Sequence, residues 1–587
     1  MFVVFEGIDG SGKTTVSNLV VERLRAQGLT VKHLRAEGKF VSSVSEAIRS
    51  LARDSKNLEL HPRAEFLLYV ARDVQLIEEA LREALTTHDV VLADRFLYTA
   101  EVLARYGRGL PAEYTKPILD AAAGGLSPDL VVLIDVDPVL ARARRKSFKL
   151  VAKDSRPPSR KGLSGVGLQH RVRRGYLELA AAAPEHWFVI SNEDVLEDTV
   201  SRVSDLVKLS VEQGAVAALA QQRGFERTTG LAASLGHPVR TPDDALRALK
   251  RWLELRAERE PQVAAYVLGG LHGEPVDELR RTLAARVPSV VLSGLEGLTD
   301  DVSWELRDQL CDEQPVAVAR SLNYLAQRDP RAASLRARLE KLAPAELARS
   351  LSRSDDDGSW EVRERLYAAH PEAVAASLSG LTSERASALR ETWFAARKKQ
   401  LPEDYELSRV ASRSVHAVGD ELAWEIRAAA RVAAPIASLS SLGELTCERS
   451  WELRERSLRR ATKVVMETLR RLREPRAWQM RWDVASETKE AVDSIVGLED
   501  EEAWRLREAF LDVWPSTVVK TLGHLADGER GRAMVQRQLA AHPNNVSLLK
   551  HAAAIALGAH TSELGPDSTG TESLLPRALI GVGARTA

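Results

Sequence analysis

A short stretch near the start of the chain has the residue types and spacing that bind phosphate groups. Gly7 to Thr14 follow the pattern G-x-x-x-x-G-K-T, directly after an apolar run from Phe2 to Phe5. In such a loop the backbone N–H groups point at phosphate oxygens, the lysine reaches the transferred phosphate, and the threonine hydroxyl suits Mg²⁺. The pattern therefore predicts a nucleotide-binding loop rather than a merely structural glycine turn. The residues expected to contact the nucleotide are Gly7, Ile8, Asp9, Gly10, Ser11, Gly12, Lys13, Thr14 and Thr15.

A second candidate group is the dipeptide Asp94-Arg95, which directly follows the apolar run from Val90 to Ala93. A carboxylate at the end of a strand beside a phosphate loop can hold Mg²⁺, directly or through water, or orient an acceptor phosphate. An adjacent arginine can bind a phosphate through two parallel hydrogen bonds. We therefore expect Thr14 and Asp94 to hold a metal ion and Arg95 to contact phosphate; a surface ion pair is the alternative.

The elements that position these residues alternate between strand-like and helix-like segments over residues 1–210. This alternation predicts an α/β domain with a parallel sheet flanked by helices, and a ligand site at the carboxyl ends of the strands. One expected helix, Pro62–Leu85, carries an apolar run that ends at Arg72, which either extends into solvent or reaches into the cleft. The expected strands are Phe2–Phe5, Thr30–Leu34, Val90–Ala93, Leu130–Val136 and Trp187–Ile190, and the other expected helices are Thr15–Gln27, Val44–Ala52 and Tyr114–Ala122.

Residues 276–559 have a different character, because an apolar residue followed by arginine recurs about every 27 residues. Proline is favoured in the first turn of a helix and breaks a helix interior, so the prolines divide each repeat into two helices. Such pairs bury their apolar faces only by stacking, which predicts an all-α solenoid that resembles HEAT-like arrays. The apolar residues are Leu279, Leu306, Leu335, Val362, Leu389, Ile426, Leu453, Met480 and Leu506, the tryptophans two positions before them are Trp304, Trp360, Trp424, Trp451, Trp478 and Trp504, and the prolines are Pro288, Pro315, Pro371, Pro435 and Pro515.

Further expectations concern the surroundings of these repeats. The tryptophans are expected to pack between repeats, and an exposed aromatic recognition surface is the alternative. A longer interval around residues 398–414 predicts an insertion that forms a loop on one face. Residues 211–275 are predicted to form a helical linker and capping segment, and residues 560–587, rich in Gly, Ser and Thr, to be disordered.

The composition limits the classes of protein. A chain of 587 residues is too long for one core, so two or more domains are expected. The formal net charge of −1 gives no bulk electrostatic argument for a nucleic-acid or membrane partner. Cys311 and Cys447 lie far apart in the sequence and lack metal-ligand spacing. We therefore expect them to be buried free thiols in a reducing cytosol. With no signal peptide and no apolar run long enough to span a membrane, the sequence predicts a soluble cytoplasmic protein.

Taken together and in this order, the motifs over residues 1–210 resemble those of thymidylate kinases, nucleoside-monophosphate kinases of the phosphate-loop superfamily. The family opens with F-E-G-x-D-G-x-G-K-T-T, and its Asp-Arg motif is followed at a fixed spacing by Gly-Arg-Gly. It also has a strand P-D-L-x-x-x-L-D-V and a characteristic helix after its lid. The matching segments are Phe5–Thr15, Asp94-Arg95 with Thr99 at the family's serine position, Gly107-Arg108-Gly109, Pro128–Val136 and Arg171–Ala180.

This resemblance implies ATP and Mg²⁺ as cofactors and a role for individual residues. Lys13, Asp94 and Arg95 would be catalytic, and Thr14 and Asp94 would bind the metal. Glu37 lies with Arg35 in a segment that matches the family's Arg-Glu-Pro-Gly-Gly imperfectly. The acceptor-binding residues implied are Asp9, Arg35, Leu68, Arg72, Arg95, Thr99 and Arg108.

A basic segment from Ala143 to Arg171 corresponds to the family's mobile lid. Family members with glycine after the loop acid, as Gly10 is here, take a catalytic arginine from this lid. Positive charge delivered on closure would stabilise the transferred phosphoryl group and exclude water, whereas a solvated basic loop is the alternative. The family's acidic lid signature is absent, so no single arginine is selected. The basic residues are Arg144, Arg145, Lys146, Lys153, Arg156, Arg160 and Lys161.

The chain differs from the family at residues that recognise the base of the nucleotide. Leu68 stands where the family has a phenylalanine that stacks on thymine, and the residues after Thr99 lack the family's Ala-Tyr-Gln. A site without these stacking and hydrogen-bonding groups discriminates less well between bases. The positions that replace Ala-Tyr-Gln are Val102, Leu103 and Ala104, and the aromatic residues that could substitute are Phe66, Tyr69, Phe96, Tyr98 and Tyr106.

These observations favour phosphoryl transfer from ATP to a deoxynucleoside monophosphate, dTMP above the others. The solenoid would then be an accessory scaffold that recruits a protein partner or self-associates. One alternative is a kinase for another nucleoside monophosphate. The other is a nucleotide-switched scaffold that acts through its solenoid, although a switch has no need for two acceptor-phosphate arginines, Arg72 and Arg95.

Overall fold

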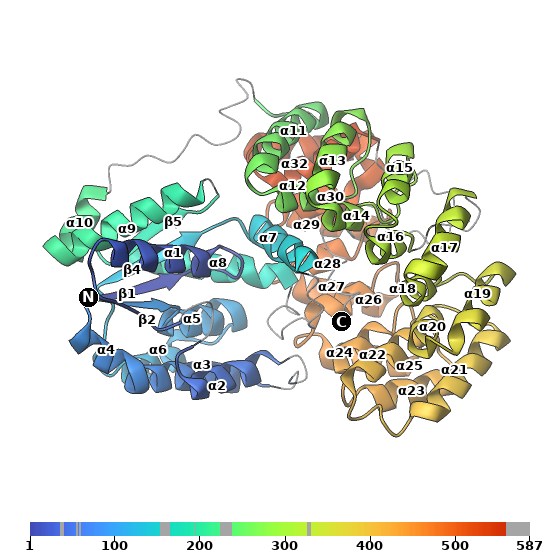
Figure 1. Cartoon of the computed structure of the whole chain (residues 1–587), viewed down its shortest axis with the longest axis horizontal. Coiled ribbons are helices and arrows are strands. Elements are labelled where there is room, and N and C mark those ends of the chain that lie inside the picture. The colour runs from blue at the N-terminus through green and yellow to red at the C-terminus, as the bar shows by residue number, and fades with distance from the viewer. Residues whose placement is uncertain are drawn as a thin grey trace. The chain divides into compact units, whose positions relative to one another are not determined.

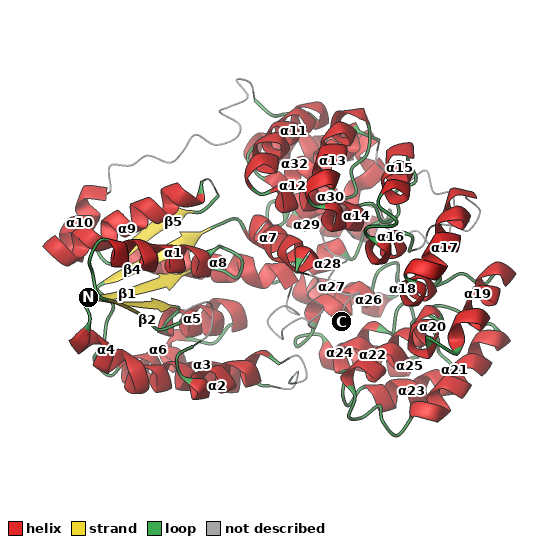
Figure 2. Cartoon of the chain, viewed as in Figure 1, coloured by secondary structure: helices red, strands yellow, loops and turns green. Residues whose placement is uncertain are grey.

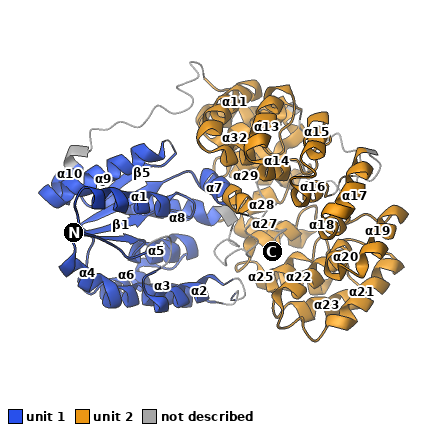
Figure 3. Cartoon of the chain, in the orientation of Figure 1, with its two compact units in different colours: residues 1–145, 159–228 blue, residues 146–158, 229–587 orange. Residues whose placement is uncertain are grey.

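A computed structural model of the chain describes residues 1–35, 40–54, 57, 60–152, 165–193, 195–222, 238–323, 325 and 330–558. It divides into unit 1, residues 1–145 and 159–228, and unit 2, residues 146–158 and 229–587 (Figure 3). The predictions made for Glu37, for Lys153, Arg156, Arg160 and Lys161, and for residues 560–587 lie outside the described residues.

Unit 1 is built on a five-stranded parallel sheet with the strand order β2-β3-β1-β4-β5. Figures 1 and 2 show this sheet with helices packed around it. The predicted α/β fold with a parallel sheet is confirmed. In the pairing of β1 with β3, Phe5 lies beside Asp94, so the carboxyl ends of both strands meet at one edge of the sheet. That edge is where a parallel sheet places its ligand. The strands are β1 (Phe2–Glu6), β2 (Val31–His33), β3 (Val90–Asp94), β4 (Leu130–Asp135) and β5 (Trp187–Ser191).

Helices cover the sheet through apolar side chains. Val16 of α1 and Val203 of α9 share one buried core with Phe5 of β1. Ala218 of α10 belongs to the same core, so the compact unit continues beyond residue 210. The helices of unit 1 are α1 (Lys13–Ala26), α2 (Ser43–Arg53), α3 (Pro62–Leu76), η2 (Ile77–Leu81), α4 (Arg82–Thr87), α5 (Leu97–Val102), η3 (Leu103–Gly107), α6 (Ala112–Ala123), α7 (Pro138–Val151, which crosses the unit boundary), α8 (Gly165–Ala182), α9 (Leu196–Gln213) and α10 (Ala215–Gln222).

The described part of unit 2 consists of helices joined by turns. The predicted all-α repeats are confirmed, and each of the five prolines singled out in the sequence begins the second helix of a pair. The helices are α11 (Pro242–Arg259), α12 (Pro261–Leu268), α13 (Glu274–Arg286), α14 (Pro288–Gly294), α15 (Asp301–Gln309), α16 (Pro315–Ser321), α17 (Pro330–Leu342), α18 (Pro344–Ser350), α19 (Asp357–Tyr367), α20 (Pro371–Ser377), α21 (Glu384–Arg397), α22 (Tyr405–Ser414), α23 (Glu421–Ala430), α24 (Pro435–Ser440), α25 (Glu448–Ser457), α26 (Thr462–Thr468), α27 (Pro475–Ala485), α28 (Glu490–Asp493), α29 (Glu501–Phe510), α30 (Pro515–Leu522), η6 (Gly523–Asp527), α31 (Glu529–Ala541) and α32 (Val546–Ala556).

The arginine of the repeated dipeptide is a buried connector between repeats. Arg363 donates from Nε to Ser377 Oγ over 2.9 Å, on the second helix of its own repeat, and from Nη2 to the Leu351 carbonyl over 2.8 Å, at the end of α18. Trp360 lies between this guanidinium and that of Arg385 in the next repeat, at 4.8 and 5.0 Å from its ring centre. The tryptophan therefore packs between repeats. The other buried arginines of the series are Arg280, Arg307, Arg390, Arg427, Arg454, Arg481 and Arg507.

The helix pairs of unit 2 form a closed circuit of contacts. Second helices pack on one another from α12 through α14 and onward to α30, and the last helix, α32, packs against both α30 and α11. Lys550 Nζ on α32 donates to the Gly269 carbonyl over 2.6 Å. The expected capping segment thus contributes α11 and α12 to this closure. The expected insertion around residues 398–414 contains α22, which packs between α20 and α24 as a regular second helix, so the loop prediction was wrong.

Candidate active site

The phosphate loop leaves β1 and enters α1 through glycines with positive φ. Gly10 and Gly12 have φ of 92° and 93°, a conformation that side chains other than glycine rarely adopt. A Cβ on Gly10 would lie 2.2 Å from the Ala141 carbonyl oxygen, and one on Gly12 would lie 2.3 Å from Asn192 Nδ2. Both positions therefore require glycine.

Lys13 lies inside this loop and is almost fully buried. Its Nζ donates to the Ile8 carbonyl over 2.8 Å, so the ammonium is held where the loop curves around it. Burial, and to a lesser extent the nearby Arg95, lower the pKa of Lys13 to about 7, although Asp94, Asp9 and Glu6 act in the opposite direction. An anion bound in the loop would restore the ammonium to its charged form.

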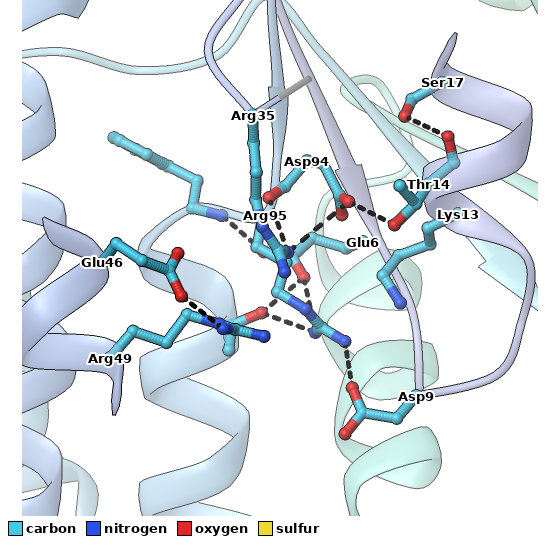
Figure 4. A network of polar contacts seen from close by, with 12 residues as sticks. Glu6, Asp9, Lys13, Thr14, Ser17, Arg35, Glu46, Arg49, Asp94 and Arg95 are labelled. Atoms are coloured by element: carbon cyan, nitrogen blue, oxygen red, sulfur yellow. Dashed lines mark hydrogen bonds and ion pairs between the residues drawn. The ribbon is translucent and has the colours of Figure 1, made fainter. Parts of the chain in front are cut away.

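Thr14 and Asp94 meet across the edge of the sheet, as predicted. Thr14 Oγ1 donates to Asp94 Oδ2 over 2.7 Å (Figure 4). Burial raises the pKa of Asp94, but Arg35, Lys13 and Arg95 outweigh that effect and hold the pKa below its usual value. The other carboxylate oxygen, Oδ1, is buried and has no hydrogen-bond partner in the described structure. An ionised carboxylate oxygen without a partner, beside a hydroxyl, is the donor set that Mg²⁺ prefers.

The described residues hold no group of three or more His, Cys, Asp or Glu that could form a metal site. Mg²⁺ in phosphate-transfer sites is commonly held by one or two protein oxygens together with substrate phosphates and water. The Thr14–Asp94 pair fits that arrangement.

Arg95 bridges the strand end and the phosphate loop. Its Nη2 donates to Asp9 Oδ1 over 2.5 Å (Figure 4). Its Nη1 donates to Thr99 Oγ1 over 3.0 Å. Arg35 lies beside the same strand end, with Nη1 3.5 Å from Asp94 Oδ2. The structure therefore brings together five of the predicted acceptor- and metal-binding residues, which are Asp9, Arg35, Asp94, Arg95 and Thr99.

Arg72 and Arg108, two further predicted acceptor-binding residues, are each paired with a carboxylate. Arg72 is buried and forms a bidentate pair with Asp73, whereas Arg108 Nε donates to Glu65 over 2.7 Å. The Arg72 guanidinium also lies 5.0 Å from the centre of the Tyr69 ring. Leu68 is only half-buried on the same helix, α3. The sequence allowed two positions for the Arg72 side chain, in solvent or in the cleft. Because the side chain is buried, it does not extend into solvent.

Other contacts in the site were not foreseen from the sequence. Glu6, quoted only as part of a motif, binds Phe96 and Thr99, and Tyr176 of α8 joins the same group. Arg173, in the same helix, forms a bidentate pair with Asp135 at the end of β4. Of the basic lid residues, Arg144 lies on α7 and donates from Nη1 to the Asn192 carbonyl over 2.7 Å. These partners are distant in sequence, and only the resemblance of residues 171–180 to the family's post-lid helix pointed toward them.

A parallel sheet with a glycine loop between β1 and α1, a lysine inside that loop and a carboxylate at the end of β3 define a phosphate-loop phosphotransferase. Comparison with known families gives the particular group: the thymidylate kinase family model matches residues 5–203. The thymidylate kinase of Desulfovibrio desulfuricans is 38% identical over 205 residues, which are 34% of this chain and 91% of that protein. The enzyme of Pelotomaculum thermopropionicum is 37% identical over 214 residues, 36% of this chain and 92% of that protein.

A crystal structure of thymidylate kinase from Ehrlichia chaffeensis covers 35% of this chain and 98% of its own, with 25% identity and a TM-score of 0.28. On the sequence relatives, the chain belongs to the thymidylate kinase family through its amino-terminal third, and it is a nucleoside-monophosphate kinase. No helix in the described part of the chain is long and apolar enough to cross a membrane.

Proposed function

We propose that the protein transfers the γ-phosphoryl group of ATP to dTMP, forming dTDP and ADP. The observation that carries the proposal is the continuity of donor and acceptor groups at one sheet edge. Thr14 of the phosphate loop donates to Asp94, and the adjacent Arg95 donates to Asp9 on the same loop. A phosphate donor bound by the loop and a phosphate acceptor bound by Arg95 would therefore lie next to each other.

The chemistry needs no side-chain nucleophile, because a phosphate oxygen of the acceptor attacks in line. Mg²⁺ held by Thr14 and Asp94 would supply positive charge between the donor phosphates. Lys13 binds the transferred phosphate, and Arg95 and Arg72 hold the acceptor phosphate in position. Asp9 contacts the acceptor sugar, with Arg35, Thr99 and Arg108 completing the acceptor side. Positioning and charge neutralisation then supply the rate acceleration.

A kinase for another nucleoside monophosphate is favoured by one observation. Val102, Leu103 and Ala104, which replace the family's Ala-Tyr-Gln, are all buried apolar residues. They offer no hydrogen bond to a base, so base selection here depends on other groups. For unit 2 we propose a scaffold role with a protein partner, which is supported by the large surface that stacked repeats expose.

The test measures ADP formation by the full-length chain with ATP, Mg²⁺ and, separately, dTMP, dUMP, dCMP, dAMP and dGMP. Lys13→Ala serves as the blank. Turnover that strongly favours dTMP supports the proposal. Preference for a different nucleoside monophosphate would change the proposed substrate but not the proposed phosphoryl transfer. Absence of acceptor-dependent turnover, with ATP still bound, contradicts the kinase proposal.

A further inference from the structure

Glu6, at the carboxyl end of β1, is completely buried and accepts three hydrogen bonds. Its Oε1 accepts from the backbone N–H of Phe96 over 3.0 Å. Its Oε2 accepts from Thr99 Oγ1 over 2.8 Å and from Tyr176 Oη over 2.8 Å. The carboxylate therefore joins three segments that lie far apart in the sequence, namely β1, the residues after β3, and α8.

The hydrogen bonds of Glu6 have a defined direction. The hydroxyl groups of Thr99 and Tyr176 both donate to Glu6 Oε2, so their protons point toward Glu6. Their lone pairs are then available to Arg95, whose Nη1 lies 3.0 Å from Thr99 Oγ1 and 3.4 Å from Tyr176 Oη. A guanidinium only donates. Glu6 thus orients the hydroxyl groups of Thr99 and Tyr176 so that both oxygens can accept hydrogen bonds from Arg95.

The backbone of Arg95 shows why such an anchor is needed. Its φ is 82°, in the left-handed region that residues with a side chain rarely adopt. A conformation of this kind persists only where the surrounding structure holds it. The N–H of Arg95 donates to the Phe5 carbonyl over 3.0 Å, and the next N–H, of Phe96, donates to Glu6. The peptide groups on both sides of Arg95 are therefore tied to β1.

We propose that Glu6 is a positioning residue for the reaction. It holds the strained backbone of Arg95 and, through Thr99 and Tyr176, aims the Arg95 guanidinium at the acceptor phosphate. The three hydrogen bonds of Glu6 described above all lie on the Arg95 side, so the effect falls mainly on the acceptor. The inference rests on the proposed function, because it needs Arg95 to bind the acceptor. Burial and the charge of Glu6 raise the pKa of Tyr176 well above its usual value, which keeps this phenol a proton donor.

The test compares Glu6→Gln with the wild-type full-length chain in steady-state kinetics with dTMP and ATP. The amide keeps the shape of the side chain, but its NH₂ group donates, so that group faces either the N–H of Phe96 or the hydroxyl groups of Thr99 and Tyr176, and one of these anchors of Arg95 is lost. We expect the KM for dTMP to rise about tenfold or more, as for a lost hydrogen bond to a charged group, with the KM for ATP within about twofold of the wild type. Calorimetric titration of dTMP gives the same comparison without turnover.

Tyr176→Phe separates positioning from folding, because it removes one hydroxyl and leaves the ring packed. We expect a smaller rise in the dTMP KM, and no further rise when Tyr176→Phe is added to Glu6→Gln. The matched control is Asp129→Asn, because Asp129 also accepts a backbone N–H, that of Phe2 over 2.7 Å, at the opposite end of β1. This control should leave both KM values unchanged.

The outcomes distinguish the two proposals. A wild-type chain without dTMP-dependent turnover or dTMP binding contradicts the proposed function itself. A wild-type chain that turns over dTMP, with a folded Glu6→Gln variant of unchanged dTMP KM, overturns only the role of Glu6. Equal rises in the KM for dTMP and for ATP also overturn it, because they indicate a general structural effect. If Glu6→Gln fails to fold, an unchanged dTMP KM in Tyr176→Phe overturns the proposal, and a selective rise supports it.

Discussion

The guanidinium of Arg72 forms a bidentate ion pair with the carboxylate of the next residue, Asp73, inside unit 1. Nε lies 2.8 Å from Oδ1 and Nη2 lies 2.7 Å from Oδ2, and both side chains are almost fully buried. An arginine held in this way keeps one orientation before any substrate arrives. The pair therefore fixes the orientation of the Arg72 guanidinium within unit 1.

Removing this partner should destabilise the kinase unit. Asp73→Asn leaves the buried Arg72 without its counter-charge, and breaking a buried pair in this way costs about 3–5 kcal/mol of unfolding free energy. Denaturant unfolding followed by circular dichroism measures the change. Asp120→Asn is the control, because Asp120 forms an exposed pair with Lys116 at 3.3 Å, and such pairs contribute about 0–1 kcal/mol. Equal effects of the two substitutions would show that the Arg72–Asp73 pair has no special role.

The metal dependence of the reaction should follow the Thr14–Asp94 pair. Thr14→Val removes a hydroxyl that lies 2.7 Å from Asp94, and we expect the Mg²⁺ concentration for half-maximal activity to rise by about 10–100-fold. Addition of EDTA should abolish activity in the wild type. Ser17→Ala is the matched control, because Ser17 Oγ donates to the backbone carbonyl of Thr14, over 3.1 Å, and not to the Thr14 hydroxyl or to Asp94. A Mg²⁺ titration that does not separate Thr14→Val from Ser17→Ala argues against metal binding at Thr14.

The lowered pKa of Lys13 predicts proton uptake on ATP binding. Because burial holds this pKa at about 7 in the free protein, much of Lys13 is neutral above pH 7. The phosphates of ATP raise the pKa, so binding takes up a proton above pH 7 and takes up none well below it. The affinity for ATP should accordingly fall as the pH rises through 7. Calorimetry in buffers with different heats of ionisation counts the protons, and Lys13→Met should abolish the uptake.

Local patterns in the sequence were enough to locate the phosphate loop and the Asp94-Arg95 pair at the ends of two strands. Both are consecutive residues at the end of an apolar run, and parallel strands bring such ends together without further information. The contact between Glu6 and Tyr176 spans 170 residues, and no periodicity or motif spacing encodes it. The pairing of Arg72 with Asp73 was also missed, because neighbouring residues on a helix point in different directions and sequence alone does not reveal burial.

In unit 2 the sequence revealed the spacing of the repeats, but it did not reveal that the repeated arginines are buried and connect the repeats. Leucine followed by arginine suggests an amphipathic helix edge in which the arginine faces water. Arg454 is instead buried, because carbonyl groups at the ends of neighbouring helices need donors and its guanidinium supplies them. It donates to the Gly443 and Leu445 carbonyl oxygens, each over 2.7 Å. The burial of an arginine therefore depends on the stacking of repeats, which a single repeat does not show.

This role predicts the effect of removing one connector. Arg454→Met removes the hydrogen bonds to the Gly443 and Leu445 carbonyl groups and to Thr468 Oγ1, and we expect a loss of about 2–4 kcal/mol of unfolding free energy in unit 2. Arg449→Met, on the same helix, removes an exposed pair with Glu421 and should change stability little. Denaturant unfolding of both variants makes the comparison. A stability loss confined to Arg449→Met would contradict the connector role.

Base recognition should improve when the missing aromatic ring is restored. Leu68 is half-buried on α3, at the position where the family has a phenylalanine, and the neighbouring Tyr69 is directed to Arg72. Leu68→Phe supplies a ring for the base to stack on, and aromatic pairs contribute about 0.5–1.5 kcal/mol beyond their buried area. That gain corresponds to a decrease of about 2–13-fold in the KM for dTMP.

The kinetics of the five deoxynucleoside monophosphates give the measurement, with Leu67→Phe, an exposed position on the same helix, as the control. A lower KM for dTMP in Leu68→Phe alone places the base over α3. No change, or an equal change in Leu67→Phe, shows that the base lies elsewhere and that this chain selects its acceptor by other contacts.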